Sequence, residues 1–109
     1  MPLIYHLVPA DEWSQVLNLN VYRPASLATE GFIHCSYRDQ VLATAARFFS
    51  AYDDLVVLVI NEKRVKAHLK AEAAHEELFP HVYRELTLDD VEDTHMLLKG
   101  PDGVWEWVS

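Results

Sequence analysis

The sequence has 109 residues, 50% of them hydrophobic and 24% charged, which is typical of one globular domain. The formal net charge is -8, and residues 1–70 hold seven acids and seven bases whereas residues 71–109 hold ten acids and two bases. Because no basic patch is visible, duplex nucleic acid is excluded as a first choice of partner. We expect residues 1–109 to form a single domain.

The cellular setting can also be predicted from the sequence. The longest apolar run, Leu55–Ile60, is far shorter than the ~20 residues that span a bilayer, so we expect no membrane contact. The N-terminal segment lacks the basic and apolar regions of a signal peptide. The single cysteine, Cys35, permits no intramolecular disulfide. We therefore expect a cytoplasmic location.

The first third of the chain predicts a strand, a helix and a second strand. Residues 3–8 are β-branched and aromatic enough for a buried strand, which Pro9 ends before a short amphipathic helix. Residues 18–31 contain many turn formers and predict an irregular connection. Residues 32–35 predict a second, short strand.

The middle of the chain contains the clearest periodic patterns. Ser36 and Asp39 have the spacing of a helix start, with the Ser36 hydroxyl as the N-cap. Residues 41–52 carry one apolar stripe at helical spacing, and residues 55–60 form a continuous apolar run that predicts a central strand covered on both faces. Residues 61–78 fit either a strand or a helix.

The last third predicts more strands. Residues 79–86 have a strand pattern and residues 88–91 a turn pattern. Residues 95–98 and 104–108 flank a Gly-Pro-Asp-Gly sequence that favours a hairpin. We therefore expect an α+β fold, with a small split β-sheet of mixed or antiparallel strands and two to three helices.

Three histidines occupy unusual places in this pattern. His6, His34 and His81 each lie inside an apolar, strand-like run. Each could be a hydrogen-bonded core residue, because buried polar groups are usually satisfied structurally. For all three together, we expect a shared cleft, since burial of an imidazole without partners costs free energy.

The segment around His34 predicts an anion site. Free backbone N–H groups at a helix start bind phosphate or carboxylate, and His34 precedes the predicted start at Ser36 by two residues. Strand alternation places Cys35 on the opposite face from His34. A nucleophilic role for Cys35 is therefore disfavoured against that of a small buried residue.

Several motifs are also similar to a known family. They are Ile4-Tyr5-His6, Tyr22-x-Pro24-x-Ser26-Leu27-x-x-Glu30-Gly31-Phe32-Ile33-His34-Cys35-Ser36, Asp54-Leu55-Val56-Val57-Leu58 with Glu72 downstream, and Phe79-Pro80-His81-Val82-Tyr83. Together they resemble domain-of-unknown-function family 952. That family resembles the ADP-ribosyltransferase superfamily at the fold level, in which a small split β-sheet forms a cleft for NAD.

The resemblance implies roles for individual residues. His6 would match the first-strand histidine that contacts the ribose of NAD, and His34 with Ser36 would match the second-strand motif. The best-known transferases also need a glutamate late in the sheet. Glu85 and Glu106 lie late in this sequence and Glu72 lies earlier, but none stands in a recognisable motif.

We therefore predict a cleft that binds NAD or another nucleotide phosphate, with ADP-ribosyl-transfer-type chemistry by a transferase or hydrolase as its catalytic version. In that version His34 or His81 orients or protonates the reacting group, and Glu72 or Glu85 stabilises developing positive charge. The residues predicted to bind the cofactor are His6, Ser26, His34, Ser36 and Tyr37.

Two hypotheses of other classes stay open. His6, His34 and His81 with Glu72 could supply metal ligands, as could His68, Glu72 and Glu76 if their segment is helical. Alternatively, the chain could be a non-catalytic interaction module, whose acidic last third meets a basic protein partner or keeps the protein soluble. Trp105 and Trp107 would share a strand face there, which is more often core than a binding platform.

Overall fold

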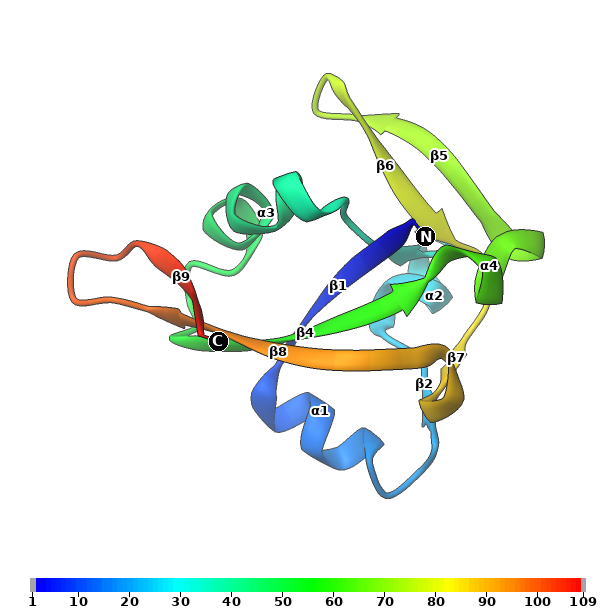
Figure 1. Ribbon diagram of the computed structural model, residues 1–109, viewed down its shortest axis with the longest axis horizontal. Helices are drawn as coiled ribbons and strands as arrows, with labels where there is room; N and C mark the ends of the chain where they lie inside the picture. The colour runs from blue at the N-terminus through cyan, green and yellow to red at the C-terminus, as the bar shows by residue number, and fades with distance from the viewer. Residues whose placement is uncertain (1, 109) are drawn as a thin grey trace.

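The apolar run at residues 55–60 lies in the middle of a four-stranded antiparallel sheet (Figure 1). The computed structural model describes residues 2–108. Strand β4 (Asp54–Asn61) pairs with β1 (Leu3–Pro9) on one side and with β8 (Val91–Lys99) on the other. Strand β8 then forms the predicted hairpin with β9 (Trp105–Val108). The central position predicted for residues 55–60 is confirmed.

Both faces of this sheet are covered. Alternate residues of β4 contribute to two separate hydrophobic clusters. Helix α1 (Ala10–Val16) packs into one cluster through Trp13 and Val16, and helix α3 (Val41–Phe48) packs into the other through Val41. Figure 1 shows the two helices on opposite sides of the sheet. The alternating side chains of a strand allow one apolar run to serve both clusters.

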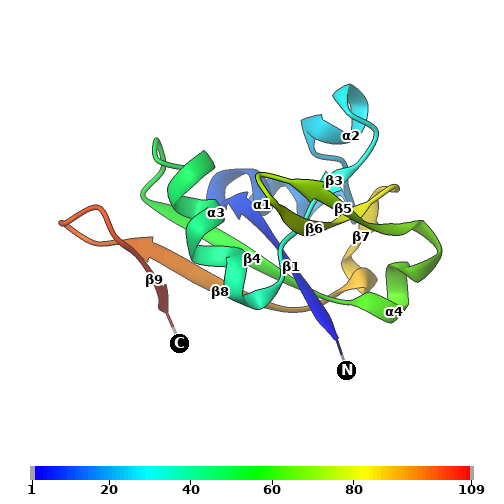
Figure 2. The ribbon, with the colours of Figure 1, turned by 90° about the horizontal axis from the view of Figure 1, so that it is seen from above.

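A second, three-stranded sheet supplies the other wall of the functional region. Its order is β3 (Ile33–His34), β6 (Glu77–Val82) and β5 (Leu69–Ala74), and all its pairings are antiparallel. The hairpin β5–β6 projects from the body of the molecule (Figure 1), and the view from above shows it beside β3 (Figure 2). A β-bridge between Tyr5 and Ser36 links this sheet to β1. The β-structure is therefore split into separate sheets, as predicted. The described strand pairings are antiparallel rather than mixed.

The remaining elements are short. Strands β2 (Val21–Tyr22) and β7 (Leu86–Thr87) form a two-stranded ribbon, and helices α2 (Ala25–Thr29) and α4 (Glu62–Val65) bring the described helices to four. The prediction of two to three helices was therefore wrong, because a single turn is too short to show helical periodicity. In residues 2–108 no helix is long and apolar enough to cross a bilayer.

The ambiguous segment at residues 61–78 contains both kinds of structure. After α4, a 3-10 turn (Lys66–His68) leads into β5, and a turn at His75 and Glu76 leads into β6. The predicted strand at 79–86 ends early, at Val82. The structure is thus a small single-domain α+β fold whose second half is built from antiparallel hairpins.

The predicted helix start at Ser36 was wrong. The Ser36 backbone instead continues the sheet, since its N–H donates to the Tyr5 carbonyl at 2.6 Å and its own carbonyl accepts from the Tyr5 N–H at 2.8 Å. A 3-10 turn (Arg38–Gln40) precedes α3, and the side chain of Gln40 accepts a 2.9 Å hydrogen bond from the Tyr37 N–H. Pairing with β1 therefore outcompetes capping by the Ser36 hydroxyl.

Candidate functional site

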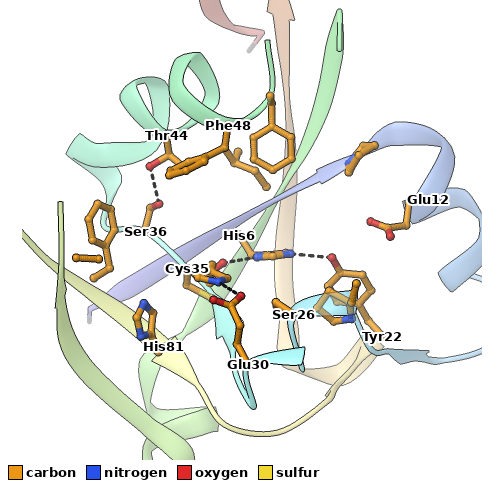
Figure 3. Close-up of a pocket in the computed structure, with 18 of the residues that line it drawn as sticks. His6, Glu12, Tyr22, Ser26, Glu30, Cys35, Ser36, Thr44, Phe48 and His81 are labelled. Carbon is orange, nitrogen blue, oxygen red and sulfur yellow. Dashed lines mark hydrogen bonds and ion pairs between the residues drawn. The ribbon is translucent and has the colours of Figure 1, made fainter. Parts of the chain in front are cut away.

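A pocket of about 630 Å³ lies between β1, α3 and the hairpin β5–β6 (Figure 3). Five predicted cleft residues from separate parts of the chain line it together: His6, Ser26, His34, Ser36 and His81. The end of the apolar stripe predicted at residues 41–52 also faces this space, because Phe48, Phe49 and Tyr52 line the pocket. Three other predicted site residues, Tyr37, Glu72 and Glu85, do not line it.

His6 connects the floor of the pocket to its surroundings. Its Nδ1 lies 2.5 Å from the carbonyl oxygen of His34, and its Nε2 lies 2.7 Å from the hydroxyl of Tyr22. A carbonyl only accepts, so Nδ1–H donates to it and Nε2 accepts from the tyrosine. Burial lowers the pKa of His6 to about 4, which keeps the ring neutral. Both ring nitrogens are therefore occupied by the protein itself.

His34 and His81 form one wall of the pocket. They are directly opposite each other in the β3–β6 register, and their ring centroids lie 5.3 Å apart. His34 is half-exposed, and its Nε2 lies 2.7 Å from the carboxylate of Glu30. His81 is buried, and its Nδ1 lies 2.9 Å from the carboxylate of Glu72. Each histidine thus has its own glutamate and retains a second ring nitrogen.

The predicted phosphate site at residues 36–37 is not formed. The N–H groups of Ser36 and Tyr37 are already bound, to the carbonyl of Tyr5 and the side chain of Gln40. The Ser36 hydroxyl lies 3.2 Å from the Thr44 hydroxyl, which also lines the pocket. An anion would therefore have to displace existing backbone hydrogen bonds to bind there.

Two other lining residues are held by the surrounding structure. The Ser26 hydroxyl donates a 2.8 Å hydrogen bond to the carbonyl of Phe32, which fixes the loop before β3. Burial raises the pKa of the Cys35 thiol to about 12. Cys35 therefore remains a thiol at neutral pH and is unsuited to act as a nucleophile.

The charges that line the pocket are acidic. Glu12 at the start of α1 and Glu30 before β3 both line the pocket. Within residues 2–108, no lysine or arginine lines it. Glu85 lies elsewhere, with its carboxylate 2.6 Å from Nε of Arg23. No site role was predicted for Glu12, Glu30 or Tyr22. Glu30 lies in the segment that resembles the family, and its position four residues before His34 was the available signal.

The described residues do not form the metal site that was considered from the sequence. Within residues 2–108, no group of three or more His, Cys, Asp or Glu side chains is placed to hold a metal ion. His68, Glu72 and Glu76 do not share a helix face, because they lie in a 3-10 turn, in β5 and in the turn after it. The set of His6, His34, His81 and Glu72 is not assembled either, because both nitrogens of His6 are engaged and the Glu72 carboxylate already accepts from His81 and Tyr83.

The two tryptophans of the acidic last third, Trp105 and Trp107, pack against the hydrophobic core and do not form an exposed binding surface. Trp105 is buried in the cluster beneath α3. Trp107 is half-buried, and the guanidinium of Arg38 lies 3.8 Å from its ring centroid. The predicted core role is confirmed for Trp105. A basic protein partner stays a prediction.

Comparison with known proteins identifies the family. Residues 7–94 match the family described as protein of unknown function (DUF952). The chain belongs to the DUF952 family. No curated protein matches the chain.

Two solved structures are similar to this DUF952 chain over nearly its whole length. The crystal structure of protein CC0527 from Caulobacter crescentus is 32% identical, covers 95% of this chain and 93% of its own, and has a TM-score of 0.86. The solution NMR structure of CC0527 is 33% identical, with coverages of 95% and 91% and a TM-score of 0.82. The predicted family is confirmed, and the likeness to ADP-ribosyltransferases stays a prediction.

Proposed function

We propose that the pocket binds NAD, or a related nucleotide, through its nicotinamide riboside end. The observation that carries this proposal is the pocket lining, which combines aromatic rings with the carboxylates of Glu12 and Glu30 and, among the described residues, no lysine or arginine. The oxidised nicotinamide ring is flat and positively charged, so it complements aromatic faces and carboxylates. A phosphate group lacks this complementarity.

The dimensions and polar groups of the pocket suit a riboside. A volume of about 630 Å³ lies within the range of small-molecule pockets, roughly 300–1,000 Å³. The Glu30 carboxylate and the unbound ring nitrogen of His34 can hydrogen-bond ribose hydroxyls. The amides of Ser36 and Tyr37 are engaged, so we assign the diphosphate to the open side of the pocket.

The catalytic version of the proposal is ADP-ribosyl-transfer-type chemistry. Cleavage of an N-ribosyl bond develops positive charge on the sugar, and a nearby carboxylate stabilises that charge. Glu30 lines the pocket, whereas Glu72 and Glu85 do not. We therefore assign this role to Glu30 and place the activity in the cytoplasm, as the sequence predicts.

A ¹H–¹⁵N titration with NAD, NADH and ADP-ribose tests the binding. We expect NAD at millimolar concentration to shift amide resonances of residues 32–38, with NADH about tenfold weaker because its reduced nicotinamide is uncharged. Glu30→Gln should weaken NAD binding several-fold, whereas Glu85→Gln, a change outside the pocket, should not. The absence of shifts with NAD, or equally tight binding of ADP-ribose, contradicts the proposal.

A further inference from the structure

The side chains of Glu72, His81 and Tyr83 are linked to one another by hydrogen bonds at the base of the hairpin β5–β6. The carboxylate of Glu72 accepts a 2.9 Å hydrogen bond from Nδ1 of His81 and a second, short one from the hydroxyl of Tyr83. The ring of Phe32 stacks on His81, with centroids 4.1 Å apart and planes at 16°. His81 is only 5% exposed. Its ring is therefore fixed in both position and orientation.

This arrangement also selects the tautomer of His81. The hydrogen bonds from Tyr83 and His81 lower the pKa of Glu72, so its carboxylate is ionised and can only accept. The proton of a neutral His81 must then sit on Nδ1, which leaves Nε2 with a free lone pair. No described residue is hydrogen-bonded to Nε2, and His81 lines the pocket while Glu72 does not.

We propose that His81 is the general base of this pocket and that Glu72 and Tyr83 are its positioning residues. The inference rests on the proposed function for the identity of the ligand. Nε2 of His81 removes a proton from a water molecule or an acceptor hydroxyl. That oxygen forms a bond to C1′ of the ribose, while the C1′–N bond breaks and its electron pair leaves with neutral nicotinamide.

Glu72 contributes to this step without touching the ligand. When Nε2 takes a proton, His81 becomes an imidazolium, and the adjacent carboxylate stabilises its charge. The other titratable groups around His81 are Lys70 on β5, and His34 on β3 with its partner Glu30. The Tyr83 hydroxyl donates to the same oxygen, Oε1 of Glu72, that accepts from Nδ1 of His81, and so helps to keep this oxygen beside the imidazole.

Nicotinamide release from NAD, followed by chromatography across a pH series, tests the assignment. We expect release by the wild type to fall as the pH is lowered, because a general base must be unprotonated to accept a proton. His81→Gln should lower the rate at least about 100-fold while NAD affinity changes less than about threefold. Glu72→Gln should lower the rate about tenfold and move the midpoint of the pH profile to lower pH, because the stabilising carboxylate is lost. Glu77→Gln, an exposed carboxylate on β6, is the matched control.

A second measurement does not depend on turnover. Long-range ¹H–¹⁵N spectra of the wild type should show neutral His81 protonated on Nδ1, and Glu72→Gln or Tyr83→Phe should perturb that ring. The opposite tautomer, or an unchanged rate in folded His81→Gln, overturns the assignment. Binding of NAD without nicotinamide release overturns this inference alone, whereas absence of NAD binding overturns the proposed function and this inference with it.

Discussion

The hydroxyl of Tyr22 donates a 2.7 Å hydrogen bond to Nε2 of His6, and both residues are buried. Because Nδ1 of His6 donates to the carbonyl of His34, one imidazole ties β1 to the β2 segment and to β3. Burial also raises the pKa of the Tyr22 phenol, so this hydroxyl keeps its proton. Both ring nitrogens of His6 therefore have partners within the protein, and the ribose contact that the family resemblance implies for His6 stays a prediction.

Replacement of Tyr22 by phenylalanine should lower the free energy of unfolding by about 1–3 kcal/mol, because Nε2 of His6 is left buried without a partner. Urea denaturation at pH 7 measures this change. Tyr52→Phe is the control, since Tyr52 lines the same pocket but is 43% exposed. Equal stabilities of the two variants would show that the Tyr22–His6 bond contributes nothing.

The depressed pKa of His6 makes stability depend on pH. The folded value is about 4 and the ordinary value 6.5, so the unfolded chain binds the proton more readily between these limits. The contribution of neutral His6 is thus fully present above pH 6.5 and is lost as the pH falls towards 4. From pH 7 to pH 5 this loss is about 2 kcal/mol.

Two measurements check the behaviour of His6. Its ring resonances should not titrate in the folded protein between pH 8 and pH 5. The loss of stability from pH 7 to pH 5 should be about 2 kcal/mol smaller in His6→Asn, whose side-chain amide can replace the Nδ1 donor. A His6 ring that titrates near pH 6.5 in the folded state contradicts the structure.

Cys35 should be inert in the folded protein. Burial raises the pKa of its thiol to about 12, and thiol reagents react with the thiolate. A disulfide reagent at pH 8 should label the native protein slower by orders of magnitude than the guanidinium-unfolded protein. Stoichiometric labelling of the native state within minutes would reinstate Cys35 as a candidate nucleophile.

Asp90 should be the most sensitive carboxylate for stability among those described. Its carboxylate is buried, and it accepts hydrogen bonds from Arg84 at 2.8 and 3.1 Å and from the Thr87 N–H at 2.9 Å. Burial raises the pKa of Asp90, but these hydrogen bonds outweigh it and lower the pKa overall. Asp90→Ala should lower the free energy of unfolding by about 3 kcal/mol, because the Arg84 guanidinium loses its carboxylate partner.

The neighbouring Asp89 provides a matched control for this substitution. It is exposed and lies in the same 3-10 turn, Leu88–Asp90. Asp89→Ala should change stability by less than about 0.5 kcal/mol in thermal or urea unfolding. Similar losses in both variants would mean that the turn, and not the buried ion pair, determines the effect.

The parts of the fold that were predictable from sequence have long periodic patterns. The run at 55–60 and the hairpin around residues 100–103 were predictable because each pattern spans a whole element. Helices α2 and α4 are too short for periodicity to appear, and the two-residue strands are defined only by their distant partners. The helix start predicted at Ser36 was wrong because Tyr5, with which the Ser36 backbone pairs instead, lies far away in the sequence.

The site was predictable as a collection of residues but not as a set of contacts. Apolar surroundings singled out His6, His34 and His81, and the structure lines one pocket with all three. The separate partners of these rings depend on tertiary geometry, so the sequence could not distinguish Glu72, which holds His81, from Glu30, which faces the pocket. The catalytic and cofactor roles stay predictions.

The pairing of His34 with His81 across β3 and β6 makes the pocket sensitive to chain length. Side chains alternate between the two faces of a strand, so a register slip of one residue would exchange His81 for Pro80 or Val82. Insertion or deletion of one residue in β6 would therefore turn the His81 imidazole away from the pocket, although no pocket residue would have been replaced by another amino acid. In this protein, the spacing of the backbone specifies the site as firmly as the identity of its histidines.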